Sequence, residues 1–388
     1  MIESVRLDGA GKKLTYGMVG GGANSFIGSV HRKAAAFDGK CIIAAGAFSQ
    51  DYQNTLETGA ALGIEDDRLY KDFYQMAQQE ANRADKIDFV IIAAPNYVHY
   101  EASKAFLQAG ISVVCEKPLV GTVEQGEELK KLAEDNDLLF CVTYSYAAYP
   151  LVRQMKKLVD DGKLGDILMV MGEYPQDWLI ELMEKESKQA AWRTDPKVAG
   201  ISNCTGDIGS HIEHMVGYIT DLKIKRLLAR LDVVGAGRSL DTNSSVMLEY
   251  ENGGTGMYWS SQVAIGNDNG LKIRIYGTKG AVEWEQENPN TMKLTYAGQP
   301  SQILNRGHGY LDDVAQSRIP SGHPEGYNEA FANLYSEFAD ALIKKLSGEK
   351  LTPADIKFFT IDQGIEGVKF IRACVESSSK DATWTIVN

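Results

Sequence analysis

The sequence predicts an α/β protein of two domains: a doubly wound parallel sheet, then an α+β domain with a large, mostly antiparallel, open-faced sheet. Three observations predict it. Short β-branched runs alternate with helical patterns from Leu14 to about Thr143, a glycine-rich turn follows the first run, and longer alternating strands dominate after Pro150. Because 388 residues exceed the size at which one core stops growing, we place domains at 1–147 and 148–388, with the terminal helices packing back on the first domain.

The first domain contains five buried-strand candidates separated by helical patterns. The strands are Leu14–Val19, Cys41–Ala47, Phe89–Ala94, Ser112–Cys115 and Leu139–Thr143, and the helices include Asn54–Leu62, Val98–Gln108 and Val123–Asp135. The second domain's strands include Ile167–Glu173, Ser244–Glu249, Gly256–Ser261, Lys272–Tyr276 and Ala281–Gln286, and two late helices cover Gly326–Lys345 and Pro353–Glu376. Strands that alternate with helices indicate a parallel sheet, and consecutive strands joined by turns indicate an antiparallel one.

Composition excludes several classes of partner. The formal net charge of −12 repels nucleic acid and anionic lipid, so we expect neither as a partner. The strongly apolar run Phe89–Ala94 is far shorter than the roughly 20 residues a membrane helix needs, and residues 1–13 lack a signal-like apolar segment. We therefore expect a soluble cytoplasmic protein. The five cysteines are widely spaced and indicate neither a disulfide framework nor a zinc knuckle.

A glycine-rich turn follows the first strand and opens a helix. Gly20 and Gly22 match the first two glycines of G-x-G-x-x-G, whereas the third falls at Gly28 after an extension of the loop. Such glycines let the backbone approach a pyrophosphate, and the helix N-terminus offers unpaired N–H groups to it. The turn therefore predicts a dinucleotide site, against the alternative of a plain strand-to-helix turn. Its expected cofactor contacts are Gly20, Gly22, Asn24, Ser25, Phe26 and Ile27.

The second strand runs into Ser49, where a carboxylate would bind the ribose 2′-OH of NAD. No Arg follows Ser49 immediately, although Arg32 in the first helix is a candidate to reach a 2′-phosphate. We expect Ser49 to contact the cofactor, which we take to be NAD without excluding NADP. Asp51 either caps the next helix or touches ribose.

Pro95, Asn96 and His99 follow the third strand, where the turn is expected to run beside the cofactor's ribose and nicotinamide. We include all three among the cofactor contacts. Asn96 also suits the N-cap of the following helix, and one residue can do both.

Glu116-Lys117-Pro118 ends the buried run Ile111–Cys115. This position places an ammonium group at the carboxyl end of a strand, where open α/β sheets bind their ligands. A lysine there can hydrogen-bond a substrate oxygen and stabilise developing alkoxide charge. Lys117 is therefore a predicted catalytic residue.

Asp207, His211 and His214 share one face if their segment is helical. A histidine can take the proton of an alcohol as hydride leaves its carbon, while the carboxylate orients the substrate or the ring. Two alternatives stay open: a structural role for all three residues, or a metal site. Because the spacing is not H-E-x-x-H and a lysine-centred site has little need of a metal, we expect none.

Three ordered motifs resemble those of the Gfo/Idh/MocA family, which includes glucose-fructose oxidoreductases and inositol dehydrogenases: Glu116-Lys117-Pro118, Trp192-Arg193, and Asp207-x-Gly-x-His211. The resemblance covers essentially the whole chain. It implies a Rossmann domain, an open-faced sheet domain used for homo-oligomerisation as a dimer or tetramer, and hydride exchange with a nicotinamide. It also implies that Lys117, Asp207 and His211 are catalytic. Glu116, Lys117, Trp192 and Arg193 then belong to the cofactor site.

Within the family the chain resembles levoglucosan dehydrogenases and neighbouring sugar 3-dehydrogenases, in the stretches Ser25–Arg32, Glu173–Leu179, Ala191–Pro196 and Gly322–Tyr327. The resemblance implies oxidation at C3 of a sugar, anhydrosugar, glycoside or cyclitol. A polyol site needs amide, imidazole and hydroxyl partners. The expected substrate contacts are Lys117, Tyr146, Gln176, Trp178, Asp207, His211, His323 and Asn328.

The chain departs from the subgroup pattern at 144–146 and at 201–205, and His214 is not a family hallmark. We expect these two segments to line the substrate pocket, so the substrate is expected to differ from levoglucosan. Two other functions stay open on the same fold. One is an NAD-dependent glycosidase that oxidises C3 transiently, and the other is a non-catalytic dinucleotide-sensing regulator.

Overall fold

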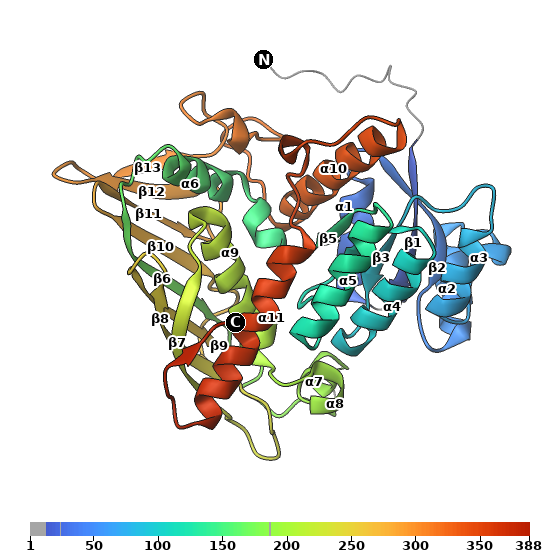
Figure 1. Ribbon diagram of the computed structural model, residues 1–388, viewed down its shortest axis with the longest axis horizontal. Coiled ribbons are helices and arrows are strands. Elements are labelled where there is room, and N and C mark those ends of the chain that lie inside the picture. The colour runs from blue at the N-terminus through green and yellow to red at the C-terminus, as the bar shows by residue number, and fades with distance from the viewer. Residues whose placement is uncertain (1–12, 24, 186–187) are drawn as a thin grey trace.

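The computed structural model describes residues 13–23, 25–185 and 188–388, and it confirms the predicted α/β class with two sheets (Figure 1). The first sheet is parallel, in the order β2-β1-β3-β4-β5. Its strands are β1 Leu14–Gly20, β2 Cys41–Ala47, β3 Phe89–Ala93, β4 Ser112–Cys115 and β5 Phe140–Val142. Every residue of β3 and β4 is buried because helices cover both faces of the sheet.

Five helices connect these strands: α1 Phe26–Ala36, α2 Tyr52–Leu62, α3 Phe73–Ala81, α4 Asn96–Gln108 and α5 Val123–Asp135. Side-chain caps set several of their starts. Asp51 caps α2 by accepting a hydrogen bond from the Gln53 N–H, and Thr122 forms a capping box with Gln125 at α5. The topology brings the carboxyl ends of the neighbouring strands β1, β3 and β4 to one edge of the sheet.

The second sheet has nine strands in the order β13-β12-β11-β10-β6-β9-β8-β7-β14. All pairs are antiparallel except β6 with β9. The strands are β6 Ile167–Pro175, β7 Ile224–Asp232, β8 Asn243–Tyr250, β9 Thr255–Ser261, β10 Lys272–Gly277, β11 Gly280–Glu285, β12 Thr291–Tyr296, β13 Gln302–Asn305 and β14 Thr385–Ile386. Buried and exposed residues alternate along β8 and β9, so one face packs on helices and the other is open.

Helices α6 Pro150–Asp160, α9 Ser210–Thr220 and α11 Ile361–Ser379 cover the inner face of this sheet, and Figure 1 shows α9 and α11 between the two sheets. Helix α10 Tyr327–Leu346 packs on α1, and α11 packs on α5. The last helical segments therefore contact elements of both halves. None of the helices in the described part of the chain combines the length and hydropathy needed to cross a membrane.

The continuous helix expected over Pro353–Glu376 is wrong in its first part. Pro353–Asp355 form a single 3₁₀ turn, and the long helix begins only at Ile361. The reason is tertiary, because the Phe359 carbonyl accepts a hydrogen bond from the Val142 N–H at the edge of β5. Buried Phe358 and Phe359 hold this extended link in place.

Candidate active site

A cavity of about 1130 Å³ lies where the carboxyl edge of the parallel sheet faces the second sheet. This volume exceeds the roughly 300–1,000 Å³ of most single-ligand pockets, so it has room for a dinucleotide together with a small substrate. Most residues expected at the cofactor line it: Gly20, Gly22, Ser25, Phe26, Ile27, Ser49, Pro95, Asn96, Glu116, Lys117, Trp192 and Arg193. Asn24 lies outside the described residues.

The glycine turn fits a pyrophosphate in its backbone geometry. Gly20 and Gly21 adopt φ of 75° and 71°, which favours glycine, and a Cβ on Gly28 would lie 2.3 Å from the Gly21 Cα. The delayed third glycine thus lets α1 pack against the turn. Ser25 caps α1 by accepting from the Gly28 N–H. Arg32 donates to the Gly21 carbonyl at 2.5 Å and does not line the cavity, so it braces the turn instead of reaching a 2′-phosphate.

At the other end of the cavity lie Ser49, Gln50, Asn54 and Lys71. Ser49 donates its N–H to Thr55 Oγ1 and accepts from the Asp51 N–H through Oγ, so its position is tied to the start of α2. Asp51 caps that helix and does not line the cavity. Of its two predicted roles, the structure therefore supports the helix cap and not the ribose contact.

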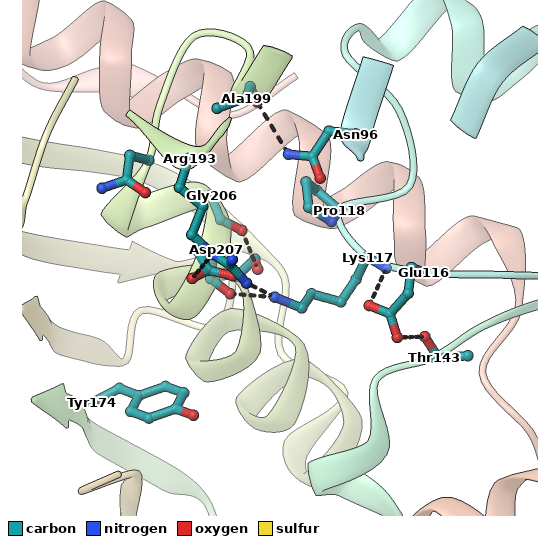
Figure 2. A network of polar contacts seen from close by, with 12 residues as sticks. Asn96, Glu116, Lys117, Pro118, Thr143, Tyr174, Arg193, Ala199, Gly206 and Asp207 are labelled. Atoms are coloured by element: carbon teal, nitrogen blue, oxygen red, sulfur yellow. Dashed lines mark hydrogen bonds and ion pairs between the residues drawn. The ribbon is translucent and has the colours of Figure 1, made fainter. Parts of the chain in front are cut away.

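After β3, Pro95 and Asn96 line the cavity as expected, but Asn96 is not the helix cap and His99 lies outside the lining. Asn96 is the first helical residue of α4, and its side chain makes no cap; its Nδ2 donates to the Ala199 carbonyl at 3.1 Å (Figure 2). His99 does not line the cavity. It is fully buried, with ring nitrogens 2.9 Å from the carbonyls of Pro118 and Ala94, so it links two turns behind the site.

Lys117 and Asp207 meet across the cavity from different halves of the chain (Figure 2). Lys117 Nζ donates to Asp207 Oδ1 at 3.0 Å and to the Asp207 carbonyl at 2.7 Å. Asp207 Oδ2 accepts from Arg193 Nε and Gln262 Nε2, both at 3.0 Å. Burial raises the pKa of Asp207, but the charges of Arg193 and Lys117 outweigh it and hold the pKa well below its usual range. Asp207 is therefore a fixed anion.

The backbone around Asp207 is unusual. Thr205–Gly209 form a π-helical turn that leads directly into α9, a feature often found at functional sites. We expected the preceding segment, 201–205, to line the cavity, but none of its residues does so. Instead, Asp241 binds Ser202, Asn203 and Thr205 from behind, and Asn203 donates to Gln262 Oε1 at 2.7 Å. This segment thereby orients the amide that holds Asp207.

His211 lies on the first turn of α9, lines the cavity and is 5% exposed. Its ring packs edge-on against Tyr146, with centroids 4.6 Å apart. Burial and the charge of Lys117 hold the pKa of His211 well below its usual value, although Asp207 acts in the opposite direction. His211 is thus a neutral imidazole at pH 7 and can accept a proton.

His214 points elsewhere. Its ring stacks on Tyr144, with centroids 3.9 Å apart, and packs edge-on against Phe359. Neither His214 nor Tyr144 lines the cavity, so Asp207, His211 and His214 do not converge on one point. Over the described ranges, no group of three or more His, Cys, Asp or Glu side chains is placed to hold a metal ion.

A network of neutral polar side chains lines the cavity beside His211. Asn269 lies at the centre of this network and links its other members. Asn269 Oδ1 accepts from the Tyr174 hydroxyl at 2.6 Å and from Gln176 Nε2 at 2.9 Å, and Asn269 Nδ2 donates to Gln286 Oε1 at 2.9 Å. The Tyr146 hydroxyl lies 2.8 Å from that of Tyr174. Sequence analysis identified Tyr146 and Gln176 but missed Tyr174, Asn269 and Gln286, because Asn269 sits in a polar turn that looks like an ordinary loop.

Three expected substrate contacts lie outside this lining. Trp178 Nε1 donates to Gln176 Oε1 at 3.0 Å, so it orients a lining residue from behind. His323 and Asn328 are exposed. The buried Arg306–Glu325 ion pair, together with a hydrogen bond from Arg306 to the His323 carbonyl, turns this loop outward. Tyr327 and Phe331 line the cavity in their place.

Comparisons with known proteins agree with this architecture. Residues 14–144 match the oxidoreductase family with an NAD-binding Rossmann fold, and residues 152–283 match the GFO/IDH/MocA C-terminal domain. The uncharacterized oxidoreductase YfiI of Bacillus subtilis (strain 168) is 38% identical over 379 residues, which cover 96% of each chain. The levoglucosan dehydrogenase of Pseudarthrobacter phenanthrenivorans is 27% identical over 54% of this chain and 58% of its own length.

Among solved structures, the inositol dehydrogenase homolog of Azotobacter vinelandii in complex with NAD+ superposes with a TM-score of 0.94 at 38% identity and covers 97% of both chains. The same homolog with NADH and myo-inositol gives a TM-score of 0.91 at 37% identity, over 97% of this chain and 98% of that one. With the glycine turn, the cavity and the Lys117–Asp207 pair in place, these matches show that the chain belongs to the GFO/IDH/MocA family of NAD-binding oxidoreductases.

Proposed function

We propose that the protein is an NAD(P)-dependent dehydrogenase of a ring hydroxyl, with C3 of a sugar, anhydrosugar, glycoside or cyclitol as the reacting carbon. The observation that carries this proposal is the meeting of Lys117, ionised Asp207 and neutral His211 at one end of the dinucleotide-sized cavity. The Azotobacter homolog crystallised with myo-inositol and the levoglucosan dehydrogenase supply the substrate class.

The three residues divide the chemistry of alcohol oxidation. Bound NAD supplies the hydride acceptor. His211 accepts the hydroxyl proton as the carbon–hydrogen bond breaks and the carbonyl forms, because its imidazole is neutral. Lys117 donates to the same oxygen and stabilises its developing negative charge. Asp207 holds the Lys117 ammonium in place through two hydrogen-bonding oxygens, its carboxylate and its carbonyl.

The charges around this end of the cavity favour an uncharged substrate. Lys117 and Arg193 are both bound to Asp207, so each already has an anionic partner. Glu116 is the other charged group at this end, and it is an anion. Beside His211 the described lining consists of neutral amides and hydroxyls: Tyr146, Tyr174, Gln176, Asn269 and Gln286. Such groups suit the hydroxyls of a polyol, whereas a sugar phosphate requires a cation that is not already paired.

Absorbance at 340 nm tests the activity. NAD or NADP is mixed with inositols, levoglucosan, glucose, methyl glucosides and glucose 6-phosphate, and we expect reduced cofactor with a neutral polyol and little with the phosphate. Lys104→Ala, which removes a surface lysine of the same domain, is the control for Lys117→Ala. Absence of reduced cofactor across the panel, despite NAD binding, would overturn the dehydrogenase assignment. Glycoside cleavage without accumulating NADH would point to the glycosidase chemistry instead.

The position of oxidation needs its own measurement. A substrate deuterated only at C3 is expected to transfer deuterium to the reduced cofactor and to slow turnover. Deuterium that stays in the product would place the reaction at another carbon.

We also propose that the protein is a homodimer or homotetramer held by the open face of the second sheet. Met247 and Met257 lie directly opposite each other on β8 and β9, both are exposed, and Leu168, Met169 and Trp259 extend the exposed apolar surface. An apolar surface of this kind is typical of an interface. Sedimentation velocity of Met257→Glu should show smaller particles than the unchanged protein, and equal masses would contradict the proposal.

A further inference from the structure

A buried chain of hydrogen bonds runs from helix α10 to Glu116, next to the catalytic lysine. The Tyr335 hydroxyl lies 2.6 Å from His31 Nδ1, and His31 Nε2 lies 2.9 Å from Glu116 Oε1. Thr143 Oγ1 donates to the same oxygen at 2.6 Å, and the backbone N–H of Lys117 donates to Glu116 Oε2 at 3.1 Å (Figure 2). His31, Thr143 and Tyr335 are each at most 2% exposed. Residues 304 positions apart thus form one network.

These contacts favour the ionised form of Glu116. A carboxylate that accepts from several donors is favoured over its acid form, and the Thr143 hydroxyl and the Lys117 N–H both supply donors. His31 Nε2 lies against Glu116 and its Nδ1 lies against the Tyr335 hydroxyl, so both ring nitrogens of His31 have a hydrogen-bond partner. Burial raises the pKa of Glu116, but His31, Lys117 and Thr143 outweigh it and lower the pKa to about 2.

Glu116 lines the cavity at the end where Lys117 and Asp207 meet. Four charged groups lie there: the cations Lys117 and Arg193 and the anions Asp207 and Glu116. Their charges sum to zero only while Glu116 is ionised. The oxidised nicotinamide carries a positive charge and the reduced one carries none, so a nearby carboxylate attracts one form and not the other.

We propose that Tyr335, His31 and Thr143 act as positioning residues that hold the Glu116 carboxylate in place, and that the Glu116 charge makes this protein bind NAD+ more tightly relative to NADH. The inference concerns the cofactor alone and does not depend on the proposed substrate. It gives the terminal helix α10 a direct role in the cofactor site, because Tyr335 belongs to α10 and His31 to α1.

The test is the ratio of two dissociation constants, measured without any substrate. NADH binding is followed by its fluorescence and NAD+ binding by calorimetry. Glu116→Gln keeps the shape and removes the charge, and the ratio of the NAD+ constant to the NADH constant is expected to rise at least about tenfold. Thr143→Val and Tyr335→Phe each remove one hydrogen bond of the network. The pKa of Glu116 is low enough for the carboxylate to stay ionised in both variants, but it is held less firmly, and we expect a smaller rise of about two- to fivefold.

Tyr70→Phe is the matched control. Its hydroxyl also donates to a buried carboxylate of the first domain, Glu80 Oε1 at 2.8 Å, but neither residue lines the cavity. The ratio should not change in this variant. A Glu116→Gln protein that loses affinity for both cofactors equally, or a Tyr335→Phe protein that behaves like Tyr70→Phe, would overturn the proposal. If Glu116→Gln fails to fold by circular dichroism, Thr143→Val and Tyr335→Phe decide the question by the same ratio.

Discussion

The turn that leads into α9 and the helix itself present two carboxylate–histidine pairs, and only one of them faces the cavity. Asp207 and His211 both line the cavity, and Asp207 is bound by Lys117, Arg193 and Gln262. Glu213 and His214 lie on the other side, where Glu213 Oε2 and both ring nitrogens of His214 have no hydrogen-bond partner among the described residues. The same residue types therefore form either a pair that lines the cavity with its carboxyl ionised or a packed cluster, according to what faces them.

The difference lies in the charges supplied by other segments. Two cations from outside α9, Arg193 and Lys117, hold the Asp207 carboxyl ionised. Burial and the charge of Glu366, only partly offset by Lys223, raise the pKa of Glu213 to about 8, so it is mostly protonated at neutral pH. Burial alone lowers the pKa of His214 to about 3. Substitutions within and opposite these two pairs test the distinction.

The largest effect is expected at His211. His211→Phe keeps an aromatic ring beside Tyr146 and removes the proton acceptor, so kcat should fall by about 10²–10⁴-fold. Steady-state rates on the best polyol measure it, with NAD affinity as the check that the cavity is intact. A loss below about tenfold would mean that another group accepts the proton.

Lys117→Ala should lower kcat by about 10²–10³-fold, since it removes the donor to the developing alkoxide. Because the Lys117 charge lowers the pKa of His211, the substitution should raise that pKa. His211 then becomes protonated, and inactive as a base, at a higher pH, so the acid limb of the residual kcat/KM profile should move upward. An unmoved limb would show that Lys117 does not set the charge state of His211.

Glu213→Gln probes the packed pair through stability. The pKa of Glu213 is about 8 in the folded state and about 4.3 in the unfolded state. Between these two pH values the folded protein therefore keeps a proton on Glu213 that the unfolded protein has released. The free energy of unfolding of the parent protein should therefore fall as pH rises from about 4.3 to 8. Because the side chain is only partly buried, we expect Glu213→Gln to be more stable by about 1–2 kcal/mol at pH 9, with little difference at pH 5. Urea unfolding at both pH values measures this, and equal stabilities at pH 9 would contradict it.

The smallest effect is expected at His214. His214→Phe preserves the stacking on Tyr144 and removes two buried ring nitrogens without partners among the described residues. We expect kcat within about twofold of the parent protein and an unchanged or higher thermal midpoint. A large loss of kcat with normal folding would show that His214 takes part in the reaction.

Much of the fold follows from local patterns. The fully buried runs at β3 and β4, the alternation along β8 and β9, and the cap at Thr122 are each legible within about ten residues, so these elements appear where they are predicted. The link before α11 differs because its backbone pairs with the edge of β5. Local propensity carries no information about such a distant partner.

Local patterns were enough to predict the fold class, the cofactor turn and the motif residues Lys117, Asp207 and His211, because each depends on short spacings and on chemistry that few residue types supply. Tertiary structure decided which polar residues share the cavity. It buried His99, turned His323 outward, brought Asn269 and Gln286 beside Tyr146, and set the charge states of Asp207, His211 and Glu213. These outcomes depend on burial and on charges from segments as far apart as the 90 positions between Lys117 and Asp207, which only the folded chain brings together.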